Sequence, residues 1–350
     1  MQYHQLGSAP IKVSEICLGS MTWGIQNTQQ DADEQIAYAL ANGINFIDCA
    51  EMYPVPPNAD TYGDTERIIG NWLARHPEKR KDLIIASKIA GSGLKYIRQG
   101  SPISGATVAL ALEDSLKRLQ TDVIDLYQLH WPNRFTPHFS KHWPGMISFT
   151  KQDAEKQTAQ MLDILTALDN AIKAGKIRYW GLSDDTPWGI SQYVRLAEQH
   201  GLAKPVSIQN EFSLLHAKDW PYLIENCVYE NIAYLPWSPL AGGALSGKYL
   251  DGARPEGTRW TLVQRQGLFR DTDISNDAVR RYVQLASEFD MSPTTLALAW
   301  CRQVDGVTST IIGATSMAQL EENIAAFSVR LTDEQLKAIT EVLKQYPMPF

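Results

Sequence analysis

Residues 45–53 read NFIDCAEMY, a stretch that passes from a short apolar run into a polar loop. The apolar residues up to Ile47 are sufficient for a buried strand, so Asp48 falls where that strand ends. Tyr53 follows in the loop, just before the breaker run PVPP at residues 54–57. An acid at the carboxyl end of a strand, with a phenol in the next loop, is typical of a site on the rim of an α/β barrel. Taken alone, the stretch equally fits a capping Asp and a packing Tyr.

The next two apolar runs end in the same way. Residues 83–88 read LIIASK and residues 123–130 read VIDLYQLH, so that Lys88 and His130 stand at the ends of successive strands. Each has a simpler interpretation, because a lysine can extend its stem to the surface and a lone histidine is more often a satisfied core residue. The three successive strands together bring an acid, a phenol, a lysine and a histidine to one end of the barrel. This combination favours a catalytic site.

The whole chain alternates between strands and helices, which predicts a (β/α)8 TIM barrel as a single domain over residues 1–350, with an N-terminal β-hairpin and long loops at its C-terminal face. We expect the hairpin at residues 3–6 and 11–13, where it would plug the bottom of the barrel. The expected barrel strands are 16–19, 44–48, 83–88, 123–130, 178–183, 206–210, 232–238 and 310–313. The expected helices are 33–41, 65–73, 107–119, 158–174, 190–200, 220–230, 276–289, 293–302 and 317–326. Residues 131–157 are expected to form a long irregular loop. Loops of this length inside a compact domain more often have a function than not.

Three local features give sharper expectations. The helix at 33–41 should bury Ile36, Ala37 and Leu40 on one face, and Thr65 should cap the helix that follows it. The helix at 107–119 is clearly amphipathic, with Val108, Leu112, Leu116 and Leu119 on one face.

Composition excludes several classes of partner. The net charge is −7 and no basic block is present, so neither a nucleic acid nor an anionic membrane surface is indicated. No apolar run reaches membrane-spanning length and the N-terminus lacks the regions of a signal peptide, which predicts a cytoplasmic protein. The four cysteines are far apart in apolar contexts and are expected to be reduced core thiols: Cys17, Cys49, Cys227 and Cys301.

Two histidines, His138 and His142, have the i, i+4 spacing of a metal site. A metal site would need a helix and a third ligand there, and Pro137 and Pro144 argue against the helix. We therefore expect solvated loop histidines and no metal.

The combined pattern resembles the aldo-keto reductases, and the resemblance covers nearly the whole chain. The motifs that carry it, beside the four strand-end residues, are LGSMTWG (18–24), DSLKRL (114–119), GKIR (175–178), WSPL (237–240) and IGAT (312–315). The stretches EMYPVPP (51–57), GNWLA (70–74) and HWP (130–132) are similar to the bacterial Tas-type branch of this family, whose relatives include the potassium-channel β subunits.

The resemblance implies a role for each of the four residues. Tyr53 would donate a proton to a carbonyl that receives hydride from a nicotinamide cofactor, because no side chain supplies hydride. A free phenol has a pKa of about 10, and the Lys88 ammonium would lower it. Asp48 would hold Lys88, and His130 would hydrogen-bond the carbonyl oxygen. Trp23 and Trp131, with Tyr53 and His130, would line the substrate pocket, and Trp143 is a further candidate wall.

The resemblance also implies the cofactor-binding residues. They are Gly19, Ser20, Met21, Asp48, Ser183, Asp184, Gln209, Trp237, Ser238, Pro239, Leu240, Ala241, Gly242, Lys248, Arg259, Gly313, Thr315, Gln319, Glu322 and Asn323. Asp184 departs from the pattern, because many members have Asn there and an Asp donates to the carboxamide oxygen only when protonated. Residues 242–249 nearly match a P-loop, but Tyr249 replaces the Ser or Thr that binds magnesium, so we expect an anion site without NTPase activity. The chain has no G-x-G-x-x-G after a strand, so a Rossmann site is not indicated.

These observations predict an NADPH-dependent oxidoreductase that reduces aldehydes or ketones to alcohols, with a small carbonyl compound as substrate. The preference for NADP over NAD rests on the resemblance. The alternative is a nicotinamide-nucleotide-binding regulatory or interaction subunit with little turnover. The sequence leaves open the physiological carbonyl and the oligomeric state, including a homo-oligomer.

Overall fold

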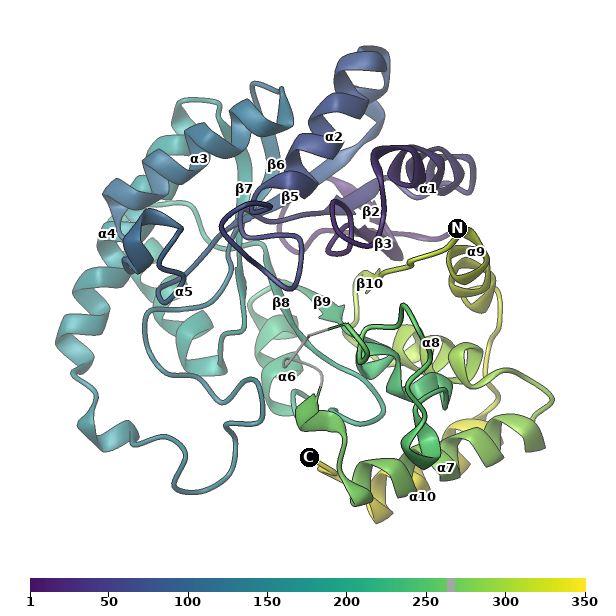
Figure 1. The fold of residues 1–350 in the computed structure, drawn as a ribbon. Coiled ribbons are helices and arrows are strands. Elements are labelled where there is room, and N and C mark those ends of the chain that lie inside the picture. Colours follow the sequence, from purple (N-terminus) through teal and green to yellow (C-terminus); the bar gives the residue numbers. More distant parts are fainter. Residues whose placement is uncertain (263–267) are drawn as a thin grey trace.

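The centre of the protein is a barrel of eight parallel strands ringed by helices (Figure 1). The computed structural model describes residues 1–262 and 268–350. The barrel strands, in chain order, are β3 (Ile16–Gly19), β4 (Phe46–Asp48), β5 (Ile84–Ile89), β6 (Ile124–Leu129), β7 (Ile177–Ser183), β8 (Ser207–Glu211), β9 (Ala233–Trp237) and β10 (Thr310–Ile312). From β3 to β9 each strand pairs with the next, and β10 pairs with β3. Between β9 and β10, the amide of Thr308, just before β10, donates to the carbonyl oxygen of Tyr234 in β9 at 2.9 Å. The predicted (β/α)8 barrel is confirmed.

Helices cover the outside of the barrel between the strands (Figure 1). They are α1 (Gln29–Ala41), α2 (Asp64–Arg75), α3 (Gly105–Leu119), α4 (Ala154–Lys173), α5 (Pro187–His200), α6 (Tyr222–Tyr229), α7 (Asp273–Glu288), α8 (Pro293–Gln303), α9 (Met317–Ala326) and α10 (Asp333–Gln345). Short 3-10 helices occur at η1 (Pro77–Asp82), η2 (Arg98–Gly100), η3 (Phe149–Lys151), η4 (Ala241–Ser246), η5 (Leu250–Gly252) and η6 (Leu268–Arg270). Helix α3 shows why these segments are helical: the Ser104 side chain caps its first turn, and the four predicted apolar residues on one face are all buried.

The N-terminal hairpin closes the amino-terminal end of the barrel. Strands β1 (Tyr3–Gln5) and β2 (Lys12–Ser14) pair antiparallel. Leu6 and Val13 from the hairpin are fully buried, and they pack with Phe46 and Leu126 from the barrel interior. Apolar side chains thus fill this end of the barrel, and the opposite, carboxyl end of the strands is where the active sites of such barrels lie.

Three local expectations were wrong. Helix α1 begins four residues early because Thr28 forms a capping box with Asp31, and Ala37 on that helix is exposed. Helix α2 is capped by Gly63 in the left-handed region (φ 83°), whereas Thr65 is fully buried inside the helix. The C-terminal helix α10 was not predicted, although Thr332 and Gln335 form a capping box at its start.

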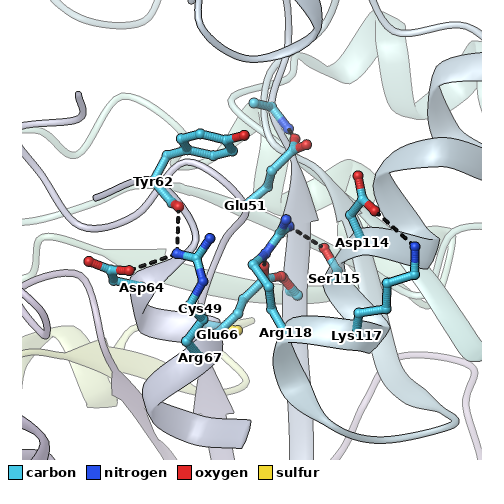
Figure 2. Close-up of polar contacts among 12 residues, drawn as sticks. Cys49, Glu51, Tyr62, Asp64, Glu66, Arg67, Asp114, Ser115, Lys117 and Arg118 are labelled. Carbon is cyan, nitrogen blue, oxygen red and sulfur yellow. Dashed lines mark hydrogen bonds and ion pairs between the residues drawn. The ribbon is translucent and has the colours of Figure 1, made fainter. Parts of the chain in front are cut away.

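A charged network ties strand β5 to the two helices that cover it. Glu66 of α2 is fully buried, accepts a hydrogen bond from the Ser87 hydroxyl of β5, and pairs with Arg118 Nε of α3 at 2.6 Å. Arg118 also donates to the hydroxyl of Ser115 at 3.3 Å, and Figure 2 shows its side chain reaching from α3 toward Glu66. The network fixes β5 directly beside Lys88, so that it braces one of the predicted catalytic residues.

The four cysteines are all buried and none forms a disulfide, as the sequence indicated. Within residues 1–262 and 268–350, no helix combines the length and the apolar character needed to cross a membrane.

Candidate active site

The four residues of the predicted catalytic set lie together at the carboxyl end of the barrel. Asp48 is the last residue of β4, Lys88 stands one residue before the end of β5, and His130 directly follows β6. Tyr53 lies in the loop between β4 and α2, and its ring meets that of His130 edge to face at a centroid separation of 5.4 Å. Lys88 Nζ lies 4.7 Å from the centre of the Tyr53 ring. Parallel strands bring their carboxyl ends to one edge, which is why residues so distant in sequence meet here.

Asp48 and Lys88 form a buried ion pair with further hydrogen bonds. Lys88 Nζ donates to Asp48 Oδ2 at 2.5 Å and to the carbonyl oxygen of Cys49 at 2.9 Å. The other carboxylate oxygen, Oδ1, accepts from Nε2 of Gln209 at 2.9 Å and from Nε2 of Gln128 at 3.2 Å. Sequence reasoning missed Gln128, although it stands two residues before His130 and side chains alternate along a strand, which places both on one face.

The ion pair keeps Lys88 charged although the side chain is completely buried. Burial by itself lowers the pKa of a lysine, but Asp48 and then Tyr53 outweigh it and raise the pKa of Lys88 above its ordinary value. A buried ammonium that retains its proton next to a phenol supplies a fixed positive charge at the place where an oxyanion would form.

Tyr53 and His130 are both held in their neutral forms. Burial raises the pKa of Tyr53, and Lys88 opposes this increase without overcoming it. The expectation that Lys88 brings the phenol pKa below its free value is therefore not met in this state of the site, because the ring is buried. Burial, and secondarily Lys88, lowers the pKa of His130 well below its usual range. His130 Nδ1 is buried without a partner among the described residues, which leaves Nε2 as the ring nitrogen that can hydrogen-bond a ligand.

A cavity of about 880 Å³ opens above these residues at the carboxyl end of the barrel. Of the residues predicted for catalysis, cofactor or substrate, those that line it are Met21, Asp48, Tyr53, His130, Trp131, Ser183, Asp184, Gln209, Trp237, Ser238, Pro239, Leu240, Gly242, Lys248, Arg259, Gly313, Thr315, Gln319, Glu322 and Asn323. Gly19, Ser20, Trp23, Lys88 and Ala241 do not. Lys88 instead supports the floor of the cavity through Asp48 and Tyr53.

Trp23 was predicted to wall the substrate pocket, and this prediction was wrong. The side chain is fully buried in the main core, where its Nε1 donates to Gln35 Oε1 of α1 at 3.0 Å. The indole therefore fixes the first βα loop against α1. Trp143 is 43 % exposed and does not line the cavity either, whereas Trp131 packs on His130 at a ring separation of 5.0 Å.

One end of the cavity is suited to anions. Gly242 and Gly243 in η4 have φ values of 67° and 95°, so that their backbone turns in a way that other residues rarely adopt. Lys248 and Arg259 both line this end. Burial, followed by the neighbouring Arg270, lowers the pKa of Arg259 to about 10, at which it is still charged near neutrality. The N-terminus of α9 stands close by, since Thr315 and Gln319 also line the cavity.

The long loop between β6 and α4 reaches the opposite wall of the cavity. His138 of this loop was expected to be solvated, but it is only 4 % exposed and packs against Asp184. His142 is half-buried, and the loop is not helical there, as its prolines indicated. No cluster of three or more metal-ligating side chains occurs in the part of the chain that the structure describes. Sequence reasoning missed two cavity residues of this loop, His138 and its neighbour Phe139. The Phe139 ring packs on Trp237 at a ring separation of 5.8 Å.

Comparison with known proteins matches this chain to one family. The family described as "Aldo/keto reductase family" matches residues 15–344. The "Protein tas" of Escherichia coli K12 is 43 % identical over 352 residues, which cover 100 % of this chain and 99 % of that protein. The "Uncharacterized oxidoreductase YrpG" of Bacillus subtilis is 30 % identical, with 98 % and 96 % covered. The "Probable voltage-gated potassium channel subunit beta" of Arabidopsis thaliana is 29 % identical, with 99 % and 98 % covered.

Proposed function

The chain belongs to the aldo-keto reductase family, and on this premise we propose that it is an NADPH-dependent oxidoreductase that reduces aldehydes or ketones to alcohols. Oxidoreductase activity in general follows from the family. The observation that carries the finer proposal is the packing of Tyr53 against both His130 and the buried Lys88–Asp48 pair, at the floor of a cavity large enough for a nucleotide and a substrate.

Tyr53 is the proton donor in this proposal. Reduction requires a group that is protonated before the reaction and that can release its proton as the carbonyl oxygen becomes an alkoxide. The raised pKa of Tyr53 keeps the phenol protonated near neutral pH. The Lys88 ammonium stabilises the phenolate that forms when the proton leaves, and Asp48 holds that ammonium in place through its 2.5 Å contact.

His130 orients the carbonyl. Because the pKa of His130 is held well below its usual range, the ring is neutral near pH 7 and donates a single N–H. A neutral donor polarises the carbonyl without competing with Tyr53 for the role of acid. Both residues line the cavity and their rings pack edge to face at a centroid separation of 5.4 Å, so a carbonyl oxygen bound beside them would lie near both polar groups.

The cavity residues fit a nicotinamide dinucleotide, which supplies hydride when it is bound. The glycines of η4, with Lys248 and the N-terminus of α9, suit the phosphates, because they offer backbone N–H groups and positive charge. Arg259 adds a second cation at the same end, which favours NADPH, with its additional phosphate, over NADH. Trp237 and Ser183 line the cavity beside Asp184 and would contact the nicotinamide end.

A regulatory subunit with little turnover is the second candidate. It is favoured by the likeness to the Arabidopsis protein, whose printed name is that of a potassium-channel subunit and which aligns over nearly its full length. The complete set of Asp48, Tyr53, Lys88 and His130 favours the enzyme, since a nucleotide sensor needs no proton donor held against a buried ammonium.

Cofactor turnover against a panel of carbonyl compounds decides between the two. The purified protein is expected to oxidise NADPH in the presence of reactive aromatic aldehydes, and to use NADH less well. Binding of NADPH is followed in parallel by quenching of tryptophan fluorescence. Tight binding of NADPH without turnover of any aldehyde or ketone in a broad panel would contradict the enzyme and support the regulatory subunit.

A further inference from the structure

Asp184 and His138 meet in the wall of the cavity, and the loop that carries His138 is separate from the catalytic floor. Asp184 follows β7 and is 3 % exposed, whereas His138 comes from the loop between β6 and α4 and is 4 % exposed. His138 Nδ1 lies 3.7 Å from Asp184 Oδ1, which is too far for a hydrogen bond but close enough for direct electrostatic interaction. His138 Nδ1 has no hydrogen-bond partner among the described residues.

The hydrogen bonds of His138 determine its tautomer. The other ring nitrogen, Nε2, lies 3.3 Å from the backbone carbonyl oxygen of Asp185. A carbonyl oxygen only accepts, so Nε2 must carry a hydrogen. In the neutral ring Nδ1 then carries a lone pair, and this lone pair faces the Asp184 carboxyl group.

The Asp184 carboxyl group has its own fixed contact. The indole Nε1 of Trp237 donates to Asp184 Oδ1 at 3.1 Å, so Oδ1 acts as an acceptor. Asp184 Oδ2 receives no hydrogen bond from residues 1–262 or 268–350, and the residue lines the cavity. An ionised Asp184 would place an anion against the lone pair of His138 with no hydrogen between them, in a nearly dry site.

The charges around the two residues disfavour the alternative of an ion pair. His138 is flanked by cations, because Lys218 Nζ donates to the carbonyl oxygen of Pro137 at 2.6 Å and the Arg134 guanidinium pairs with Asp185. Burial and then Lys218, His216 and Arg134 lower the pKa of His138 well below its usual range, although the contact with the Asp185 carbonyl opposes them.

The groups that face Asp184 include two further carboxylates. Burial raises the pKa of Asp184 well above its usual range; Glu211 and Asp219 add to this increase, whereas the Trp237 hydrogen bond and Lys218 oppose it. Glu211 is paired with Arg270, and Asp219 accepts hydrogen bonds from Asn210 and Tyr234. Tyr53 also interacts with Asp184 electrostatically, and it is a neutral phenol.

We propose that Asp184 is a neutral carboxylic acid in the working protein, kept so by the neutral His138 of the β6–α4 loop, and that it acts on the cavity as an asparagine would. Oδ1 accepts from Trp237 as an amide oxygen does, and a protonated Oδ2 offers a donor in place of an amide N–H. His138 is a positioning residue in this arrangement, because it acts through Asp184 and not on a ligand.

The pair has a consequence for the bound nucleotide, which rests on the proposed function. The oxidised nicotinamide ring is a cation and the reduced ring is neutral. A neutral Asp184 does not distinguish the two rings by charge, whereas an ionised Asp184 beside the ring would favour NADP⁺. His138 therefore sets the relative affinity for oxidised and reduced cofactor by keeping this wall of the cavity uncharged.

Spectroscopy of the nucleotide-free protein tests the proton positions directly. In the ¹⁵N NMR spectrum of the seven histidines, the signals missing from His138→Gln identify His138. They should show a neutral Nε2–H ring at pH 7. In infrared difference spectra of wild type minus Asp184→Asn, the carbonyl band of one protonated carboxylic acid should be present at pH 7. An imidazolium or Nδ1–H ring at His138, or a carboxylate at Asp184, would overturn the proposal.

Two variants separate this role from simple packing. The amide group of His138→Gln can donate to Asp184 and so stabilise the carboxylate, which should lower the midpoint for loss of the acid band by about one pH unit or more. It should also shift the ratio of dissociation constants toward NADP⁺ by about tenfold at pH 7. Asp184→Asn should retain the wild-type ratio. The control, His142→Gln, changes the same loop without touching Asp184 and should leave both readings unchanged.

The outcomes distinguish this proposal from the proposed function. Equal midpoints and equal ratios in wild type and His138→Gln would remove His138 from the role given to it. If neither nucleotide bound the wild type, the proposed function would fail, and the two spectra would still decide the protonation of Asp184 and His138.

Discussion

Lys88 Nζ lies 2.5 Å from Asp48 Oδ2 and 4.7 Å from the centre of the Tyr53 ring, and neither charged side chain is more than 3 % exposed. A single buried ammonium is thus shared between a carboxylate that keeps it charged and a phenol that it can activate. The pKa of Lys88 stays above its ordinary value because Asp48, followed by Tyr53, outweighs the effect of burial. Because of this dependence, replacing Asp48 by the isosteric Asn tests the role of the Lys88 charge without altering the shape of the site.

Asp48→Asn should abolish most of the chemical step. Without the carboxylate, burial would lower the pKa of Lys88, so that the lysine loses its charge and no longer stabilises the Tyr53 phenolate. We expect kcat for a reactive aromatic aldehyde to fall at least about a hundredfold, with NADPH affinity little changed. Steady-state kinetics and fluorescence titration measure the two quantities. A variant with near wild-type kcat would show that the pair is structural only.

The same variant should be less stable, and a double variant should recover part of the loss. Leaving Lys88 without its buried partner is expected to cost about 3–5 kcal/mol in the free energy of unfolding. In the double variant Asp48→Asn/Lys88→Met, neither of these two charges remains buried. Denaturant unfolding should therefore show a smaller loss of unfolding free energy for the double variant than for Asp48→Asn alone. Additive losses would mean that the two side chains do not interact in the folded protein.

Tyr53→Phe should remove carbonyl reduction and leave cofactor binding nearly intact, because only the acidic hydroxyl is deleted. The ring can still pack on His130 and against Lys88. We expect kcat/KM for aldehyde reduction to fall by much more than tenfold, measured by NADPH oxidation. Retention of more than about a tenth of wild-type kcat/KM, a loss below roughly 1.4 kcal/mol, would assign the acid to another group.

The barrel, and the meeting of Asp48, Lys88 and His130 at one end of it, could be predicted because their determinants are local. The apolar run that ends at Gly19 gives β3 its observed bounds, and the parallel barrel strands bring their carboxyl ends to the same rim. Asp48, Lys88 and His130 are adjacent in the barrel because strands β4, β5 and β6 are adjacent, a relation that the chain order alone implies.

The errors arose where a distant partner decides the outcome. Trp23 is buried in the core and donates a hydrogen bond to Gln35, and nothing in the sequence around Trp23 indicates that contact. His138 lies between prolines in a long loop, and the carboxyl group of Asp184, against which it packs, is 46 positions away in the sequence. Helix α2 begins after Gly63, which has a left-handed backbone conformation. The sequence does not reveal that conformation, whereas Thr65 is of a residue type that commonly caps helices.

The pH dependence of reduction should follow Tyr53. The protonated phenol is the active form for reduction, and its raised pKa means that the proton is lost only above the ordinary value of 10.0. His130 becomes charged only well below 6.5. We therefore expect kcat for reduction to be flat from about pH 6.5 to about pH 9 and to fall at higher pH. Asp184→Asn, which removes another titrating cavity group, should show the same alkaline decline. A decline centred near pH 7 in both proteins would exclude Tyr53 as its source.

The Glu66–Arg118 pair should contribute to stability and not to cofactor binding. Arg118→Met leaves Glu66 buried with only the Ser87 hydroxyl as a hydrogen-bond partner among the described residues, which is expected to lower the free energy of unfolding by about 3–5 kcal/mol. The matched control is Arg67→Met on α2 (Figure 2), whose 2.7 Å pair with Asp64 is partly exposed and should contribute less than about 1 kcal/mol. Equal effects in chemical denaturation would contradict the importance assigned to the buried network.

Lys248→Met should weaken NADPH binding with little change in the chemical step. The ammonium lies beside Gly243 in the part of the cavity proposed for the phosphates. Among the described residues, Lys248 has no hydrogen bond or ion pair with any of the four proposed catalytic residues, so its removal should not disturb them. Removing its charge should raise the dissociation constant of NADPH and reduce the dependence of that constant on salt, since screening then acts on one fewer attraction.

Quenching of tryptophan fluorescence at low and high ionic strength measures both effects, and single-turnover reduction at saturating NADPH measures the chemical step. Lys344→Met on α10 is the control, because that lysine pairs with Glu341 at the surface and does not line the cavity. An unchanged dissociation constant and salt slope for Lys248→Met would remove Lys248 from the cofactor site and leave the phosphates to Arg259 and the backbone amides of η4.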